Sequence, residues 1–157
     1  MLTGDELVSA FEQLSEEYAR FVEAQTGEAF RRRSAPEEWS TAEMTGHVAE
    51  FPVTFAAQAK RVAEQPGSQL GRSLEDPARL AAVQTLVSAG PAEAAAAVRS
   101  CARAALATLR SIQPDGWAAS GTHPRLGEMT VSHLVEHFMV DHVRDHLKQA
   151  QESVGVA

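Results

Sequence analysis

The chain has 157 residues, 44% of them apolar and 22% charged, which is typical of one soluble globular domain spanning residues 1–157. Its net charge is −7 and its longest basic run is only Arg31 to Arg33, which argues against a nucleic-acid-binding protein. Cys101 is the only cysteine, so no internal disulfide is expected, and without a signal peptide or a membrane-spanning segment the protein is expected to be cytoplasmic and not membrane-bound.

The N-terminal segment is predicted to form a long bundle helix that ends near Gln25. Thr3 and Glu6 have the spacing of a capping box, in which a hydroxyl and a carboxylate accept hydrogen bonds from free backbone amides at a helix start. The apolar residues that follow are spaced alternately by four and three positions: Leu7, Phe11, Leu14, Tyr18 and Phe21. This spacing is typical of a helix that packs along its length against other helices.

A second capping box, formed by Ser40 and Glu43, predicts another long helix, which ends before residue 66. Its apolar stripe contains Met44, Phe51, Phe55 and Val62. At about 100° per residue, His47 lies within about 60° of the centre of this stripe, which predicts a half-buried histidine at the rim of the core. Pro52 removes one backbone hydrogen bond and predicts a kink in the helix.

Two further helices are predicted in the middle of the chain. Asp76 and Pro77 have the residue types of a helix cap and first helical position, and they start a short helix that reaches Ser88. A longer alanine-rich helix spans residues 91–112, and its small residues indicate close packing against a neighbouring helix. Residues 113–128 are rich in glycine, proline and serine, which predicts a loop. With no strand-like alternation, the chain is predicted to be all-α, a four-helix bundle with one additional short helix.

The last long helix, predicted over residues 129–151, contains four of the six histidines. On a helical wheel its apolar stripe is formed by Val131, Leu134, Val135 and Phe138. His142 and His146 lie on this stripe. The opposite side of the wheel carries His133, His137, Val140 and Leu147. Two imidazoles one turn apart on one face can bind a single zinc, nickel, copper or iron ion, and two core histidines held by hydrogen bonds are the alternative.

The other histidine pair, His133 and His137, encloses Glu136 in the H-x-x-E-H pattern of one class of zinc peptidases. Those enzymes need a substrate cleft and further ligands from a larger fold, and here the pattern points away from the apolar stripe. A peptidase is therefore a remote interpretation, and contact with solvent or with a second subunit is expected for His133 and His137.

One imidazole from the second long helix and two from the last give a candidate metal site of His47, His142 and His146. Three imidazoles with an open fourth position are typical of a catalytic site, because structural zinc is usually enclosed by four ligands that include cysteine. A bundle core can bring such side chains together from facing helices. The alternative is a bundle without metal, in which these histidines only pack.

Three segments of the sequence carry a resemblance to a known family: EWSTAEMTGH at residues 38–47, HPRLGEMT at residues 123–130 and DHVRDHLKQ at residues 141–149. The first is similar to the second-helix signature of the DinB/YfiT-like superfamily of metal-dependent proteins. The other two are similar to its last loop and last helix. The resemblance covers nearly the whole chain in length and helix order.

The resemblance implies a single DinB-like domain over residues 1–157, a four-helix bundle that is often a homodimer, and a nickel or zinc ion held by His47, His142 and His146. The last helix of the family often carries several neighbouring histidines. An alternative set of ligands therefore has His137 in place of His142, but the helical wheel disfavours it.

Some relatives are thiol S-transferases that use bacillithiol or mycothiol. The resemblance therefore implies a metal-dependent thiol S-transferase or hydrolase that acts on a small-molecule thiol and an electrophilic substrate. A non-catalytic metal- or small-molecule-binding stress-response protein is the alternative.

The chemistry of such a site directs attention to nearby carboxylates, because a thiol or water molecule at an open metal position loses its proton readily. Glu50 and Asp145 are the candidate catalytic residues, as proton acceptors or as partners of the metal ligands, with ordinary surface carboxylates as the alternative. Glu43 is expected only to cap its helix. Trp117 and His123 are placed to cover the site, and Trp117 is alternatively expected to plug the bundle end.

Overall fold

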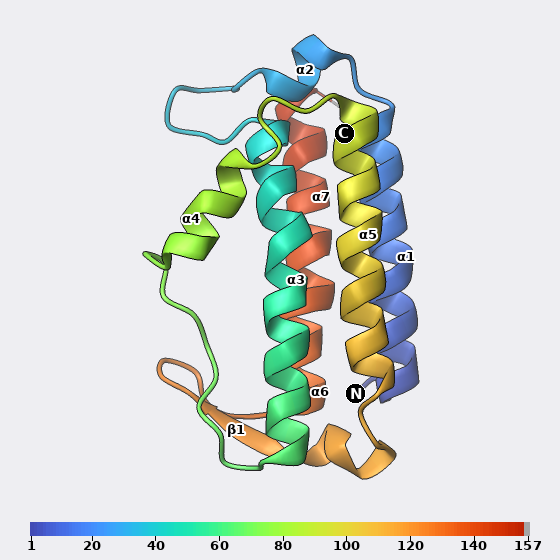
Figure 1. Cartoon of the computed structure of the whole chain (residues 1–157), viewed down its shortest axis with the longest axis vertical. Coiled ribbons are helices and arrows are strands. Elements are labelled where there is room, and N and C mark those ends of the chain that lie inside the picture. The colour runs from blue at the N-terminus through green and yellow to red at the C-terminus, as the bar shows by residue number, and fades with distance from the viewer. Residues whose placement is uncertain (156–157) are drawn as a thin grey trace.

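Four long helical segments run along the long axis of the molecule (Figure 1). The computed structural model describes residues 1–155. Its helices are α1 (Gly4–Glu23), α2 (Gly27–Arg31), α3 (Thr41–Glu64), α4 (Pro77–Gln84), α5 (Pro91–Arg110), the 3-10 helix η1 (Pro114–Ala118), α6 (Val131–Val135), the π-helix η2 (Glu136–Asp141) and α7 (His142–Ser153). The fourth long segment is formed by α6, η2 and α7 in succession. The predicted all-α class and four-helix bundle are confirmed, and no helix within residues 1–155 has the length and apolarity to cross a bilayer.

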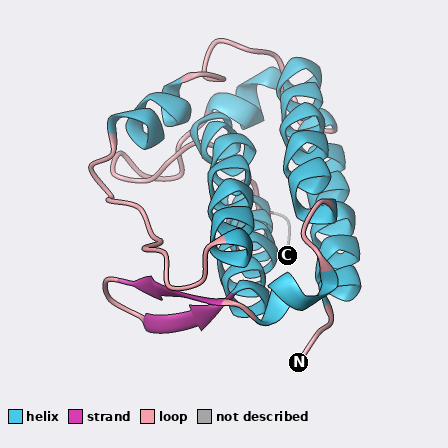
Figure 2. Ribbon diagram, turned by 60° about the horizontal axis from the view of Figure 1, so that its bottom comes forward, coloured by secondary structure: helices cyan, strands magenta, loops and turns pink. Residues whose placement is uncertain are grey.

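Some short elements were not predicted from the sequence: the helix α2 and, mostly within the predicted loop of residues 113–128, the 3-10 helix η1 and a β-hairpin. The helix α2 follows α1 after a short connection, with Thr26 as its N-cap. Strands β1 (Ser120–His123) and β2 (Gly127–Thr130) pair as an antiparallel hairpin at one end of the bundle (Figure 2). Gly127 has a φ of 76°, which a glycine adopts without strain and which allows the tight turn between the strands.

The predicted starts of three helices are confirmed by their cap hydrogen bonds. Thr3 Oγ1 accepts a hydrogen bond from the amide of Glu6, whose carboxylate accepts one from the amide of Thr3. Ser40 and Glu43 form the same reciprocal pair at the start of α3. Asp76 caps α4 through the amide of Ala78, with proline at the first helical position. The capping residues can be recognised from the sequence, and their hydrogen bonds determine where these helices begin.

The core lies between α1, α3, α5 and the C-terminal segment, and α5 packs closely against both α1 and α3. Ala94, Ala95 and Ala105 on α5 are fully buried, and their small side chains permit this close approach. One buried polar contact joins the first two long helices, where Tyr18 Oη and Thr45 Oγ1 lie 3.1 Å apart.

The C-terminal segment is not one continuous α-helix, because η2 replaces about a turn and a half of it. A π-turn holds more residues than an α-turn, so it rotates everything that follows relative to an ideal helical wheel. Before η2 the buried residues are Val131, Leu134 and Val135. After it they are Val143, Leu147 and Ala150.

The π-helix corrects five positions of the helical wheel. Val140 and Leu147, which the wheel places on the far side, are buried at 1% and 8% exposure. Phe138, which the wheel places in the core, is only half-buried. His142 and His146 are also half-buried, so they lie at the edge of the buried stripe rather than on it.

The short helix α4 lies across α3 on the outside of the bundle (Figure 1). It approaches closely at Gly46, where a Cβ atom would lie 2.1 Å from the carbonyl oxygen of Ala82. The connection before α4 is fixed by Arg72, which pairs with Glu50 of α3 and with Asp76. Both ends of α4 are thus held against the part of α3 that carries His47.

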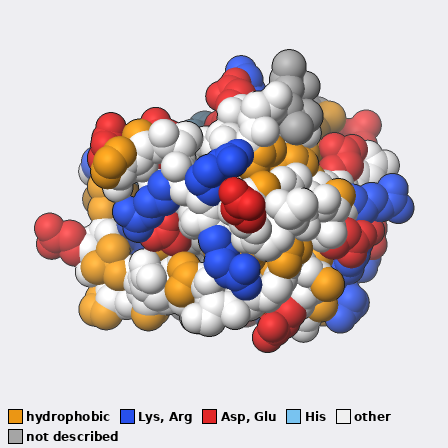
Figure 3. Space-filling model, turned by 90° about the horizontal axis from the view of Figure 1, so that it is seen from above, with side chains coloured by type: hydrophobic (Ala, Val, Ile, Leu, Met, Phe, Trp, Pro, Cys, Tyr) orange, Lys and Arg blue, Asp and Glu red, His pale blue; other side chains and the backbone are white. Residues whose placement is uncertain are grey.

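At the end of the bundle where α2 lies, acidic and basic side chains are interspersed on the surface (Figure 3). Two of the three consecutive arginines have defined partners there. Arg33 pairs with Glu43, whose side chain is almost fully buried, and Arg31 donates to the carbonyl oxygen of Ala89 at 2.7 Å. These contacts tie the connection between α1 and α3 to the rest of the bundle.

Candidate metal centre

Three histidine side chains from two helices meet on the inner side of the bundle. His47 comes from α3 and is 3% exposed, and His142 and His146 come from successive turns of α7. One nitrogen from each of the three rings lies within 4.8 Å of the other two. The histidines that the sequence selects as candidate ligands are therefore brought together, although 95 positions separate His47 from His142 in the chain.

The ring nitrogens are placed where a shared ion would need them. His47 Nε2 and His142 Nε2 are 2.9 Å apart. Two nitrogens bound to one ion, each at about 2.0–2.1 Å, are separated by about 3 Å. His146 Nδ1 donates a hydrogen bond to Gln149 Oε1 at 3.0 Å, which leaves the lone pair of its Nε2 available. The three donors fit a divalent ion that prefers imidazole.

All three imidazoles are held in the neutral form that binds metals. Burial is the main cause, and with the nearby charge of His146 and of Arg79 it lowers the pKa of His47 to about 3. Burial, and then the nearby charges of His146, His47, Arg79 and His137, lower the pKa of His142 to about 2. Burial also lowers the pKa of His146, against the opposing effects of Gln149 and Asp145. At neutral pH the cluster therefore offers lone pairs to a cation without first releasing protons.

Aromatic rings surround the histidine cluster and fix the ring orientations. Phe51 stacks on His142 with ring centroids 3.9 Å apart and an interplanar angle of 11°. Phe51 and Trp39 both contact His47 edge-on, at 5.0 and 5.3 Å. The Nδ1 atoms of His47 and His142 have no hydrogen-bond partner among the described residues, so packing rather than hydrogen bonding orients these two rings.

A pocket of about 510 Å³ opens beside the cluster. It is lined by Phe51, His137, Phe138, Asp141, His142 and Asp145. Asp145 is exposed and has no ion-pair partner among residues 1–155, whereas Asp141 pairs with Arg144. A small molecule in this pocket would touch the ring of His142 and the carboxylate of Asp145.

The carboxylate of Glu50 interacts with Arg72 and Thr54. It accepts a hydrogen bond from Arg72 Nη1 at 2.7 Å and one from Thr54 Oγ1 at 3.2 Å. Arg72 has a side-chain exposure of only 6%, so Glu50 neutralises a nearly buried charge. Of the two predicted carboxylates, only Asp145 is free to face the pocket beside His142.

The other histidines of the last helix lie outside the cluster. His133 and His137 are exposed, and their ring centroids are 6.2 Å apart. His137 lies against Phe138 at the pocket wall. The ligand nitrogens that lie close together are those of His47, His142 and His146, and not those of the alternative set with His137.

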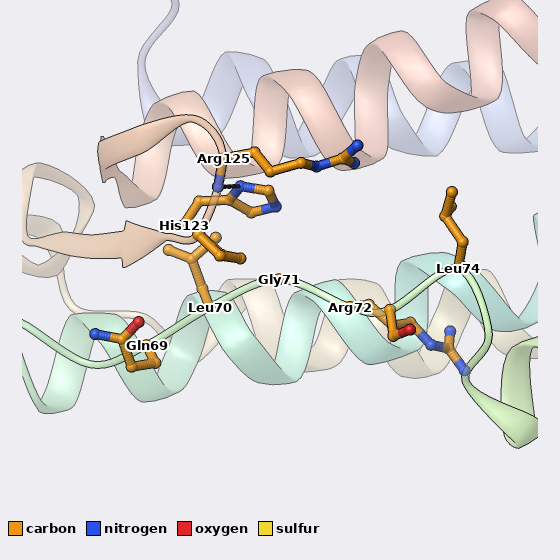
Figure 4. A pocket seen from close by; sticks show the side chains of 9 residues that line it. Gln69, Leu70, Gly71, Arg72, Leu74, His123 and Arg125 are labelled. Carbon is orange, nitrogen blue, oxygen red and sulfur yellow. Dashed lines mark hydrogen bonds between the residues drawn. The ribbon is translucent and has the colours of Figure 1, made fainter.

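His123 is buried on β1, outside the cluster, where its Nδ1 accepts hydrogen bonds from the amides of Arg125 and Leu126. Its ring stacks on Phe138 at 5.5 Å. A second pocket, of about 480 Å³, lies between His123 and the chain around Gly71 (Figure 4). His123 therefore separates this pocket from the aromatic side chains near the cluster.

Trp117 lies at the bundle end rather than over the site. A Cβ atom on Gly4 would lie 2.5 Å from its indole ring, so the ring packs directly on the first residue of α1. The expectation that Trp117 plugs the bundle end agrees with this contact.

Arg79 was not among the residues selected from the sequence. It lies on α4, and its guanidinium is 5.8 Å from the ring centroid of Trp39. The only signal in the sequence is its position three residues after the cap Asp76, which says nothing about α3. The packing of α4 on α3 at Gly46 brings Arg79 to Trp39, which contacts His47.

Comparison with known proteins identifies a family and several similar structures, two of which are given below. The family model of the DinB superfamily matches residues 10–150. YfiT from Bacillus subtilis, described as a probable metal-dependent hydrolase with an unusual four-helix bundle topology, has a TM-score of 0.70 at 16% identity, over 98% of this chain and 89% of that chain. A mutant of the mycothiol-dependent maleylpyruvate isomerase has a TM-score of 0.70 at 14% identity, over 100% of this chain and 65% of that chain. At these identities the two structures show a shared fold, and no curated protein matches the sequence.

Proposed function

Because this chain belongs to the DinB superfamily, we propose that His47, His142 and His146 bind one divalent metal ion, nickel or zinc, and that the protein is a metal-dependent enzyme. We propose further that it transfers a small thiol, of the bacillithiol or mycothiol type, to an electrophilic substrate, with hydrolysis as the related alternative. One structural neighbour is a mycothiol-dependent isomerase and the other is described as a probable metal-dependent hydrolase, which supports both reactions.

The observation that carries this proposal is the convergence of three neutral imidazoles on one point. Buried histidines that only pack have no reason to face one another, since neutral rings gain at most one shared hydrogen bond. Here His142 and His47 bring their Nε2 atoms to 2.9 Å, while Gln149 fixes the tautomer of His146 that leaves its Nε2 free. Three protein ligands leave further positions open, as in catalytic sites.

The residues around the cluster have separate tasks in the proposed reaction. When bound, the ion supplies a position at which a thiol or water molecule becomes more acidic. Asp145 accepts the proton, because its exposed carboxylate lines the pocket beside His142. Phe51 and Phe138 form the apolar wall of that pocket and exclude water from one side of the substrate. Glu50 acts through Arg72, which it holds against α3.

The proposal also includes a homodimer and a cytoplasmic location, with no nucleic-acid or membrane partner. The homodimer is proposed because members of the family are often dimers, and the acidic net charge of −7 argues against a nucleic-acid partner. Sedimentation analysis at several protein concentrations tests the dimer directly.

Metal analysis of the purified protein tests the site. About one equivalent of nickel or zinc is expected in the parent and in His133→Ala, whose histidine is exposed outside the cluster, and none in His47→Ala or His142→Ala. Equal metal content in all four proteins would contradict the proposed ligands.

Thiol conjugation to a panel of electrophiles then tests the reaction. In Asp145→Asn we expect unchanged metal content and a rate reduced about 100-fold or more, because a general base typically contributes that much. Stoichiometric metal without any conjugation or hydrolysis would favour a non-catalytic binding protein instead.

A further inference from the structure

Arg79 differs from the other half-buried arginines of this protein. Within residues 1–155 three arginines are half-buried: Arg72, Arg79 and Arg99. Arg72 and Arg99 each pair with two carboxylates. Arg79 pairs with none in the described chain, and its one side-chain hydrogen bond goes from Nη1 to the carbonyl oxygen of Leu74 at 3.1 Å. Its Nε and Nη2 groups are therefore left for another partner.

The guanidinium of Arg79 lies against Trp39, an aromatic neighbour of the histidine cluster. Its Cζ atom is 5.8 Å from the ring centroid of Trp39, and that ring lies 5.3 Å from the ring of His47. The guanidinium, the indole of Trp39 and the imidazole of His47 are therefore successive neighbours.

The position of Arg79 does not serve the stability of α4 itself. Arg79 is the third residue of that helix, where the positive end of the helix dipole disfavours a cation. The helix is nevertheless held in place on both sides, by the pairing of Arg72 with Asp76 and by the contact of Ala82 with Gly46. A rigidly held helix thus presents an unneutralised cation to the cluster.

We propose that Arg79 binds a carboxylate group of the substrate, an inference that rests on the proposed function of the three-histidine site. A guanidinium recognises a carboxylate through two parallel N–H···O hydrogen bonds, and Arg79 has the free donors for this. A divalent ion at the cluster would repel the guanidinium, and an anionic group between the two relieves that repulsion. Asp145 repels the same group from the pocket beside His142, so a substrate with one carboxylate has a single favoured orientation.

Titration of the nickel-loaded protein with two small thiols tests this inference. The probes are 3-mercaptopropionate and its uncharged methyl ester, and their binding is followed by the absorption of the nickel–thiolate complex. The parent is expected to bind the carboxylate about tenfold more tightly than the ester, as charge-assisted hydrogen bonds contribute that much. Arg79→Gln, which keeps a long polar side chain without the charge, is expected to lose this preference. Arg103→Gln, an exposed arginine on α5, is the control and keeps it.

The outcomes separate this inference from the metal site on which it rests. A parent protein that takes up no nickel refutes the metal site, and with it the inference. If nickel content is equal in the parent and Arg79→Gln but the preference persists in the variant, the metal site stands and the role of Arg79 is refuted. Loss of the preference in Arg79→Gln, with partial recovery in Arg79→Lys, supports a charge that pairs with the carboxylate.

Discussion

The three cluster histidines differ in what orients their second ring nitrogen. His146 Nδ1 donates to Gln149 Oε1, whereas the Nδ1 atoms of His47 and His142 have no partner among the described residues. A hydrogen bond of this kind fixes the tautomer and direction of a ligand, and its loss typically weakens metal binding about 10- to 100-fold.

We therefore expect Gln149→Ala to weaken the affinity for nickel or zinc by about tenfold or more while leaving the stoichiometry at one. Competition with a chromogenic chelator measures the dissociation constant. Gln151→Ala, also on α7, is the matched control and should behave as the parent does. An unchanged affinity in Gln149→Ala would mean that packing alone orients His146.

The lowered pKa values predict how the metal-free protein responds to acid. Burial lowers the pKa from 6.5 to about 3 for His47 and to about 2 for His142. Below about pH 6.5 the unfolded chain therefore binds protons at these rings that the folded protein does not bind. The free energy of unfolding falls as the pH decreases from 6.5 towards 3, and these two groups have no effect above that range.

Urea unfolding of the metal-free protein at pH 7 and pH 5 measures this dependence. The midpoint is expected to fall at pH 5, and His142→Phe, which keeps an aromatic ring against Phe51, is expected to show a smaller fall. His133→Ala removes an exposed histidine and should keep the dependence of the parent. Equal falls in the parent and in His142→Phe would contradict the assignment of this dependence to the cluster.

At the residue scale, the sequence was sufficient to nominate His47, His142 and His146, because residue type and helical spacing are local properties. It was not sufficient for Arg79, whose nearness to the cluster depends on how one helix crosses another. Nor did the spacing separate Glu50 from Asp145, since only the ion pair with Arg72 distinguishes them.

At the scale of the element, the π-helix η2 explains where the helical wheel was wrong, because the wheel assumes a continuous α-helix. It rotates α7 so that Val143 and Leu147 enter the core and His142 and His146 lie at its edge. On an uninterrupted wheel the two histidines would lie in the middle of the apolar stripe, away from any pocket. The π-helix therefore places the histidines between the core and the pocket, in line with the frequent occurrence of π-helical turns at functional sites.

The close approach of α4 to α3 at Gly46 leads to a prediction about the stability of the fold. In Gly46→Ala the new Cβ atom would lie 2.1 Å from the carbonyl oxygen of Ala82, so α4 has to move away from α3. We expect a loss of about 1–3 kcal/mol in the free energy of unfolding. The same shift carries Arg79 away from the cluster while His47 keeps its place on α3, so the metal content should be retained.

Gly90→Ala is the control for this substitution, because nothing lies within 4 Å of the added Cβ atom. As the N-cap of α5 it is expected to cost less than about 1 kcal/mol. Chemical unfolding measures both variants. A Gly46→Ala protein as stable as Gly90→Ala would show that α4 is not held tightly at this crossing.

For the whole molecule, the all-α bundle could be predicted because the capping boxes and the regular spacing of apolar residues are local features of the sequence. The β-hairpin was not, because its strands have four residues each and include Gly121 and Gly127. The helix α2 has only five residues and its one buried residue, Phe30, gives no periodic signal. Short elements of this kind are set by their contacts with the finished bundle rather than by their own sequence.

The whole molecule also determines how metal binding and stability are linked. The candidate ligands come from α3 and α7, and 95 positions separate His47 from His142, so an unfolded chain does not hold the trio together. An ion that binds only the folded protein stabilises it by about 2.7 kcal/mol when its concentration is 100 times the dissociation constant. For a chain of this length we expect the melting temperature to rise by about 5–10 °C on loading with nickel or zinc, and to fall again with a chelator. The rise should persist in His133→Ala and vanish in His142→Ala, and a similar rise in both variants would mean that the ion binds somewhere other than the cluster.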